Sequence, residues 1–226
     1  GLMVYFHVSD MLELALAFEA GVDHLLHFTG VEIDWARHGD MIQSLVDREV
    51  HWVTTLMIDK SFIYPLRPEW IDTARASGLF DRELSLAANF GMSPEAARRN
   101  AELVYGEPDP DFATNPILVK QFEDLRRLHA LGIDLVVGTD VGNRYILPGY
   151  SLHEEMALLE QAGFGPVDVL KMATINAAEL VGAAERLGSV EPGKLADLVL
   201  LNSDPRETVA NLSDIHAVLK AGNKIR

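Results

Sequence analysis

Short apolar runs alternate with amphipathic helical stretches along the first sixty residues. Runs rich in branched and aromatic side chains predict strands at Met3–Val8, Val22–Phe28 and His51–Ile58. Between them, apolar residues recur at helical spacing over Met11–Ala20 and from about Asp40 to Arg48. This alternation predicts strand–helix–strand units, which build parallel sheets.

The first of these helices carries sequence signals at both ends. Asp10 stands where an N-cap residue is expected, and Glu13 follows three residues later, as in a capping box. Gly21 comes directly after the last helical residue, where a left-handed C-terminal glycine is common. Local sequence therefore predicts both limits of this helix.

The segment from about 59 to 115 has a different character. It is rich in Pro, Asn and Gly, and its apolar residues form only short amphipathic stretches. These stretches predict helices at Pro68–Ala76, Arg82–Asn89 and Pro94–Val104. A connection of this length after a strand is typical of an insertion that covers a substrate, so we expect a helical insertion rather than a linker.

The alternation of helix and strand returns after residue 115. We expect a helix at Pro116–Leu131, a strand at Ile133–Gly138, and helices at Leu152–Gln161 and Pro166–Leu180. From Gly188 onward, Gly-Pro turns and short apolar runs predict a small β unit. The chain is thus predicted to be α/β, with a parallel sheet covered by helices and a β-rich tail.

Composition narrows the possible partners and chemistries. The 226 residues carry 19 Lys+Arg against 34 Asp+Glu, a net charge of -15 that repels nucleic-acid phosphates and anionic lipids. We therefore expect no nucleic-acid or membrane partner. Because there is no cysteine, any metal must be held by His and carboxylates, and the protein suits a reducing cytoplasm. The motifs GxSxG, GxxxxGK[ST], HExxH and GxGxxG are absent from the sequence.

Three polar residues stand at the carboxyl ends of predicted strands. His7 lies near the end of the first strand, His27 near the end of the second, and Asp140 just past the fourth. In parallel α/β proteins these ends are where ligands and catalytic groups converge. Side-chain alternation predicts that His27 shares the face of Leu25, and that His24 lies on the opposite face as a packing or helix-layer residue.

Two imidazoles and a carboxylate are a suitable ligand set for a divalent metal, with Zn²⁺ the first candidate. The segment Gly138-Thr139-Asp140 places the carboxylate on the exit from a buried strand, where it needs a cation or a catalytic proton. The alternative is that His7 and His27 are ordinary strand-end histidines that cap helices or bind backbone carbonyls.

Further polar residues near the predicted loops are candidates for binding the substrate. They are His153, Tyr64, Arg67, Arg144 and Tyr150. Imidazole, phenol and guanidinium groups at the strand ends can bind a carboxylate or another polar end of a substrate. For each of them, a solvated loop or helix-start position without a function is the competing interpretation.

Several segments together resemble the C-terminal part of metal-dependent amidohydrolases. They are VYFHVSD with His7, AGVDHLLHF with His27, the VVGTD exit with Asp140, PGYSLHEEMALLEQAGFGPVDVLKMATINAAELVG, and LGSVEPGKLADLVLLNSDP. The last two segments, over about 150–205, are highly specific as a pair. The sequence is most similar to the imidazolonepropionase-like and metallo-dipeptidase (prolidase-like) branch, and only residues 59–115 show little resemblance.

The resemblance implies a fold, a set of ligands and a reaction. Residues 1–187 would form strands five to eight of a (β/α)8 TIM barrel, and residues 188–226 part of a small β-sandwich. His7 and His27 would be metal ligands on strands five and six, and Asp140 on strand eight would bind metal and carry the proton. The reaction would be hydrolysis of an amide, peptide or cyclic amide C–N bond by water activated on one or two metal ions.

The family pattern also includes parts that this sequence lacks. An HxH pair on strand one and a lysine on strand four would precede His7, where only Gly1–Phe6 stand. Four strands do not close a barrel, so we expect a fragment or split enzyme that needs a missing N-terminal half or a homo-oligomer. The alternative is a non-catalytic half-barrel that acts only through association. A carbohydrate- or nucleotide-binding protein has no motif in its favour.

Overall fold

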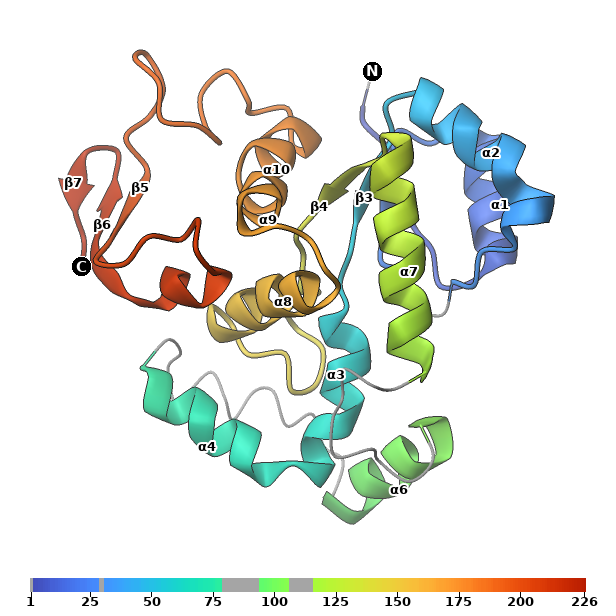
Figure 1. The fold of residues 1–226 in the computed structure, drawn as a ribbon, viewed down its shortest axis with the longest axis horizontal. Coiled ribbons are helices and arrows are strands. Elements are labelled where there is room, and N and C mark those ends of the chain that lie inside the picture. The colour runs from blue at the N-terminus through green and yellow to red at the C-terminus, as the bar shows by residue number, and fades with distance from the viewer. Residues whose placement is uncertain (1, 29–30, 79–93, 106–115) are drawn as a thin grey trace.

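The computed structural model describes residues 2–28, 31–78, 94–105 and 116–226. Its centre is a four-stranded parallel sheet with the order β1–β2–β3–β4 (Figure 1). The strands are β1 (Tyr5–His7), β2 (His24–Leu26), β3 (His51–Val53) and β4 (Asp134–Val136). Each of the three pairings is parallel, so the predicted parallel sheet is confirmed.

Each face of the sheet has its own apolar layer. One face is covered by α1 (Met11–Ala20), α2 (Trp35–Asp47) and α7 (Pro116–Leu131). Leu25, Trp52 and Leu135 belong to the main core formed with these helices. The residues that follow them, Leu26, Val53 and Val136, form a second cluster with Leu180 of α10 (Ile175–Leu180). Alternation along the strands therefore separates a helix-facing side from an inner side.

The capping signals of α1 are confirmed. The Asp10 side chain accepts the N–H of Glu13, and Gly21 adopts a left-handed conformation with φ of 67°. The next helix begins earlier than predicted, because Asp34 caps it by accepting the backbone N–H groups of Ala36 and Arg37. Local caps thus set the limits of both helices.

The third strand is shorter than the predicted His51–Ile58. It ends at Val53, and α3 (Met57–Ile63) begins four residues later. The N–H groups of Leu56 and Met57 at the start of α3 donate to the Glu155 carboxylate at 2.9 and 2.7 Å. The Glu155 carboxylate, which is distant in sequence, therefore stabilises a helix start in an apolar run whose composition predicts a strand.

The segment between β3 and α7 is helical where it is described. It contains α3, the 3-10 helix η1 (Tyr64–Leu66), α4 (Pro68–Ser77) and α6 (Pro94–Tyr105). These helices lie together below the sheet in Figure 1. The helices predicted at 68–76 and 94–104 are confirmed, and the one predicted at Arg82–Asn89 lies outside the described residues.

The helix predicted at Pro166–Leu180 is two helices, α9 (Pro166–Ala173) and α10. Thr174 breaks it with φ of -127° and ψ of -85°. Two hydrogen bonds hold the break against the outer edge of β4: the Val137 N–H donates to the Met172 carbonyl at 3.1 Å, and the Asn176 amide donates to the Leu135 carbonyl at 2.9 Å. Helical backbone thus covers part of the edge of β4.

The tail forms a separate antiparallel sheet of β5 (Leu198–Leu201), β6 (Ile215–Lys220) and β7 (Asn223–Lys224). A 3-10 helix, η3 (Val209–Ser213), connects β5 to β6 and packs on α8 (Tyr150–Gln161). The Glu160 carboxylate of α8 accepts the Thr208 hydroxyl and the Val209 N–H at 2.9 and 3.2 Å. The predicted β-rich tail is confirmed as a sheet.

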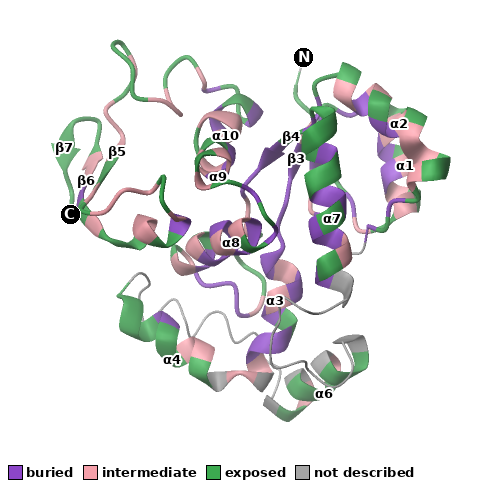
Figure 2. Ribbon diagram, viewed as in Figure 1, coloured by how far each residue is buried: buried purple, intermediate pink, exposed green. Residues whose placement is uncertain are grey.

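The chain that leads from the N-terminus into β1, the strand at the open edge of the sheet, is exposed (Figure 2). Leu2 and Val4 are 96% and 49% exposed, and Leu12 and Leu16 on the adjacent α1 are also exposed. No second strand pairs with β1 within the residues that the structure describes. Among those same residues, no helix is both long and apolar enough to cross a membrane.

Gly138 lies where the chain leaves β4, and a Cβ there would be 2.3 Å from Cγ1 of Val53. A Gly138→Ala substitution must therefore displace the Val53 side chain or push β3 and β4 apart. Overpacking of this kind lowers the free energy of unfolding by about 1–3 kcal/mol, which urea denaturation followed by circular dichroism measures.

Gly39→Ala is the matched control. Nothing lies within 4 Å of a Cβ at this position in α2, and alanine within a helix raises stability by roughly 0.5–1 kcal/mol over glycine. If Gly138→Ala were as stable as the wild type, the close contact between β3 and β4 would be contradicted.

Candidate functional site

The carboxyl ends of the strands bring the three predicted ligands together. His7 is the last residue of β1, and its ring meets that of His27 edge-on, with centroids 4.7 Å apart. The His27 Nδ1 atom is 3.9 Å from Oδ2 of Asp140. Residues that are 133 positions apart in the sequence (7 to 140) therefore lie within one small region at this end of the sheet.

Left-handed backbone conformations produce this convergence. The residues that follow β2, β3 and β4 include His27, Thr55 and Asp140, with φ of 72°, 53° and 56°. Such conformations cost a non-glycine residue about 1–3 kcal/mol and persist only where the surroundings enforce them. The prediction that His27 shares the face of Leu25 is wrong, because the left-handed turn takes its ring out of the strand alternation.

Groups of β3 and its exit hold His27 in place. The Trp52 indole N–H donates to the His27 carbonyl at 2.6 Å, and the Phe28 N–H donates to the Thr54 carbonyl at 2.9 Å. The Nδ1 atom of the His27 ring lies 3.2 Å from the Thr55 hydroxyl, and the tautomer decides which group donates. Backbone and ring of His27 are thus both fixed from the neighbouring strand.

Burial and charge act on His27 in opposite directions. Burial lowers its pKa most, the Asp140 carboxylate raises it, and His7 lowers it again. The imidazole is therefore kept neutral, the state in which a histidine binds metal. Asp140 is more accessible, with 37% of its side chain exposed, and its Oδ2 accepts the Asn143 side-chain amide at 2.7 Å.

Glu155 on α8 is a fully buried carboxyl behind this region. It accepts the Thr54 hydroxyl at 2.5 Å, in addition to the two backbone N–H groups at the start of α3. Burial raises the pKa of Glu155 to about 7, and the three hydrogen bonds oppose that rise. All three donors come from the exit of β3, which carries Thr55.

The donor chemistry suits a divalent metal, but the described residues do not complete a site. Imidazole nitrogens of His7 and His27 and a carboxylate oxygen of Asp140 are ligands that Zn²⁺ prefers. Within the ranges that the structure describes, however, no three His, Asp or Glu side chains are grouped closely enough to hold an ion by themselves. These three residues could therefore supply at most part of a metal site.

Two of the five predicted substrate residues, Tyr64 and Tyr150, lie in helices rather than in the expected loops. Tyr64 lies in η1 and is fully buried, and its hydroxyl donates to Glu154 at 2.5 Å; burial and that carboxylate raise its pKa. Tyr150 begins α8, and burial together with Glu154 raises its pKa to about 12. The Tyr64 hydroxyl is thus already bound within the protein.

The other three keep the positions that the sequence predicts. Arg67 precedes α4 and lies 3.4 Å from the Glu69 carboxylate. Arg144 is partly buried in the loop after β4. His153 is on the first turn of α8, where burial lowers its pKa.

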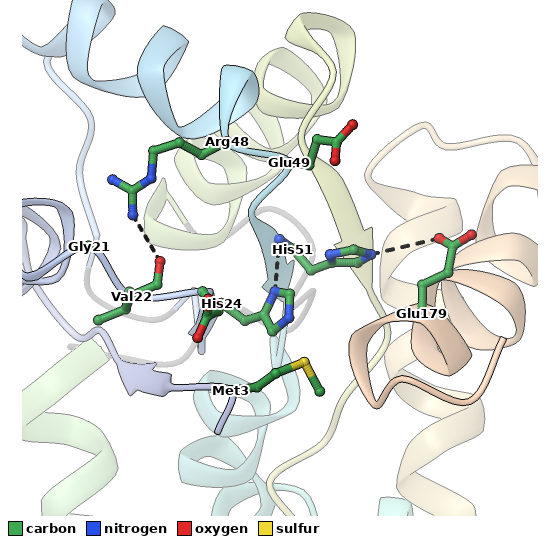
Figure 3. A pocket seen from close by; sticks show the side chains of 9 residues that line it. Met3, Gly21, Val22, His24, Arg48, Glu49, His51 and Glu179 are labelled. Atoms are coloured by element: carbon green, nitrogen blue, oxygen red, sulfur yellow. Dashed lines mark hydrogen bonds and ion pairs between the residues drawn. The ribbon is translucent and has the colours of Figure 1, made fainter. Parts of the chain in front are cut away.

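A second polar cluster lies at the opposite, amino end of the strands (Figure 3). The His24 and His51 rings are 5.0 Å apart, and His51 Nε2 is 3.7 Å from the Glu179 carboxylate of α10. His24 therefore lies on the inner side of the sheet, opposite to Leu25 as the alternation predicts, and of its two predicted roles the place in the helix layer is wrong. A cavity of about 510 Å³ here is lined by Met3, Gly21, Val22, Asp23, His24, Arg48, Glu49, His51 and Glu179.

The comparisons with known proteins agree on one family. The family described as "Amidohydrolase family" matches residues 22–225. An imidazolonepropionase from Geobacillus kaustophilus is 41% identical over 86 residues, 38% of this chain and 20% of that protein. An adenine deaminase from Oceanobacillus iheyensis is 45% identical over 62 residues, 27% of this chain and 10% of that protein.

A solved Xaa-Pro dipeptidase with bound methionine has a similar fold. It matches with a TM-score of 0.66 and 20% identity over 100% of this chain and 45% of the dipeptidase. The arrangement of strands and helices is thus consistent with part of a barrel. The chain belongs to the amidohydrolase family, whose members generally use divalent metals. The match covers less than half the length of this structure, and the matched segments cover a fifth or less of the two relatives above.

Sequence reasoning missed the residues that support His27. Thr55 and Trp52 lie in an apolar run that predicts only a strand. Glu155 does carry a signal, because it is spaced four residues from Ser151 and from Leu159 on the buried side of α8. An acidic residue on the buried side of a helix needs hydrogen-bond donors, and these are the groups at the exit of β3.

The titration of Glu155 predicts a pH dependence of stability. Its folded pKa of about 7 lies above the ordinary value of 4.5, so the stability that the protonated form contributes is present below pH 4.5 and lost as the pH rises through 7. We expect the stability of the wild type relative to Glu155→Gln to fall by on the order of 3 kcal/mol across this range, since one pKa unit corresponds to about 1.4 kcal/mol. Urea unfolding of both proteins at several pH values measures this difference in stability. If the difference did not change with pH, the raised pKa of Glu155 would be contradicted.

Proposed function

We propose that this protein contributes to the hydrolysis of C–N bonds in amide, peptide or cyclic amide substrates. The observation that carries the proposal is the convergence of His7, His27 and Asp140 at the carboxyl ends of the strands. Membership of the amidohydrolase family supports the reaction class. The matched relatives include an imidazolonepropionase and an Xaa-Pro dipeptidase, which leaves the substrate class broad.

In this proposal His7, His27 and Asp140 are ligands of one or two divalent metal ions, with Zn²⁺ preferred. The metal, when bound, lowers the pKa of a water molecule and polarises the scissile carbonyl. Asp140 takes a proton from the attacking water and returns it to the leaving nitrogen, a role that suits its partly exposed carboxylate. The products are a carboxylic acid and an amine. His153, Tyr64, Arg67, Arg144 and Tyr150 remain proposed as substrate-binding residues, and of these Tyr64 has the least support because its hydroxyl is already bound.

The remaining ligands come from outside the described residues. We propose that β1–β4 are strands five to eight of a (β/α)8 barrel and that β5–β7 belong to a small β-sandwich. The barrel is completed by an N-terminal half or by another copy of the chain, and the open edge of β1 supports this arrangement. The lack of cysteine suits a protein that works in the cytoplasm.

Metal binding by the purified chain tests the ligand assignment. We expect isothermal titration with Zn²⁺ to detect binding that His7→Ala, His27→Ala and Asp140→Asn each weaken by at least about tenfold, because each removes a ligand. His216→Ala is the control, because it removes an exposed histidine on β6 in the tail sheet. Equal affinities of all four variants and the wild type would contradict the assignment of these residues.

A second candidate function is association without catalysis, and the exposed apolar residues at β1 favour it as well. We expect light scattering to report a mass above 24.9 kDa for the wild type. Val4→Lys should lower that mass, because a lysine directly before the edge strand β1 opposes further pairing there. Val119→Lys, at a 39% exposed position on α7, is the control. A monomeric wild type would contradict association of the chain with itself through this edge.

A further inference from the structure

We infer that Glu155 is a positioning residue for His27, acting through the exit of β3. The inference rests on the proposed function in one respect, namely that His27 serves as a metal ligand. Glu155 itself does not touch His27. It binds the residues on both sides of Thr55, and Thr55 is the residue that contacts the His27 ring.

The contacts between Glu155 and His27 form a short continuous path. One carboxylate oxygen, Oε1, accepts both the Thr54 hydroxyl and the Leu56 N–H, at 2.5 and 2.9 Å. These donors come from the residues immediately before and after Thr55. The Thr55 hydroxyl lies 3.2 Å from the His27 ring, and the Thr54 carbonyl accepts the N–H of Phe28, which follows His27. Ring and backbone of His27 thus both depend on the loop that Glu155 binds.

The backbone conformation of Thr55 indicates that contacts with other residues fix this loop. Its φ of 53° lies in the left-handed region, which is unusual for a side chain branched at Cβ. A residue keeps such a conformation only when its neighbours are fixed. Here Thr54 and Leu56 are fixed by the same carboxylate oxygen of Glu155, which is fully buried.

The adjacent Glu154 provides a matched comparison. It lies on the same helix, is also buried, and its carboxylate binds Lys60 and Tyr64 at 2.6 and 2.5 Å. Neither of these partners is in the exit loop of β3. Loss of a buried carboxylate from α8 can therefore be separated from loss of the contact with the β3 exit.

The experiment measures the His27 ring directly in metal-free protein. Protein labelled with ¹⁵N-histidine gives the shifts of the two ring nitrogens, which report the tautomer and the hydrogen bond at Nδ1. We expect Glu155→Gln and Thr55→Ala to change the His27 shifts in the same direction, because both disturb the contact between Thr55 and the ring. Glu154→Gln should leave them unchanged, and Thr55→Ser should restore the wild-type shifts. Zn²⁺ affinity is measured on the same samples, and we expect Glu155→Gln to weaken it about 10- to 100-fold.

The outcomes separate this inference from the proposed function. Unchanged His27 shifts in folded Glu155→Gln protein would overturn the positioning role, whatever the metal affinity. Shifts that change equally in Glu154→Gln and Glu155→Gln would also overturn it, because the effect would then be a general one of the helix. Shifts that change only through Glu155 and Thr55, with Zn²⁺ affinity unaltered, would support the positioning role and contradict the assignment of His27 as a ligand. If Glu155→Gln does not fold, Thr54→Val, which removes one donor to the same carboxylate, takes its place with the same expected shift.

Discussion

The structure depends on the buried carboxylate of Glu155 and its three donors at the exit of β3. Without that carboxylate, the buried N–H groups of Leu56 and Met57 would lose their acceptor, which costs free energy for each group, and the Thr54 hydroxyl would keep only its 3.4 Å contact with the Val136 carbonyl. The same contacts end β3, start α3 and attach α8 to the sheet. One side chain therefore connects the central sheet, the helices of the 57–105 region and the candidate site.

The sequence predicts the parts of the fold that local signals control. Alternating strand and helix patterns predict the parallel sheet, and Asp10, Glu13 and Gly21 predict α1 with the limits that it has. Features set by distant contacts are missed. The run at 51–58 has strand composition throughout, and only Glu155, about a hundred residues later, makes it turn. In the candidate site, the positions of His7, His27 and Asp140 at strand ends correctly predict that they lie near one another. The alternation of residues along a strand cannot predict the left-handed turn at His27 or the contacts of His27 with Trp52 and Thr55.

The two edges of the sheet differ in a way that agrees with the proposed assembly. At β4, the carbonyl of Met172 and the side chain of Asn176 bind backbone groups just beyond and within the strand. At β1, the described residues provide no neighbouring strand, and apolar side chains remain exposed. A new strand therefore meets an open hydrogen-bonding edge at β1 and a partly occupied one at β4.

The contact between α8 and η3 changes how the chain should be divided. Composition changes near residue 188, which suggests a boundary between the α/β part and the tail. Yet Val209 is 3% exposed and belongs to the main core, and the Glu160 carboxylate is bound by Thr208 and by the Val209 backbone. A chain cut at the compositional boundary would lose a buried valine worth roughly 1.5–3 kcal/mol. It would also lose donors to an acidic residue on the helix that carries Glu155. A unit that keeps these contacts of α8 therefore extends into η3.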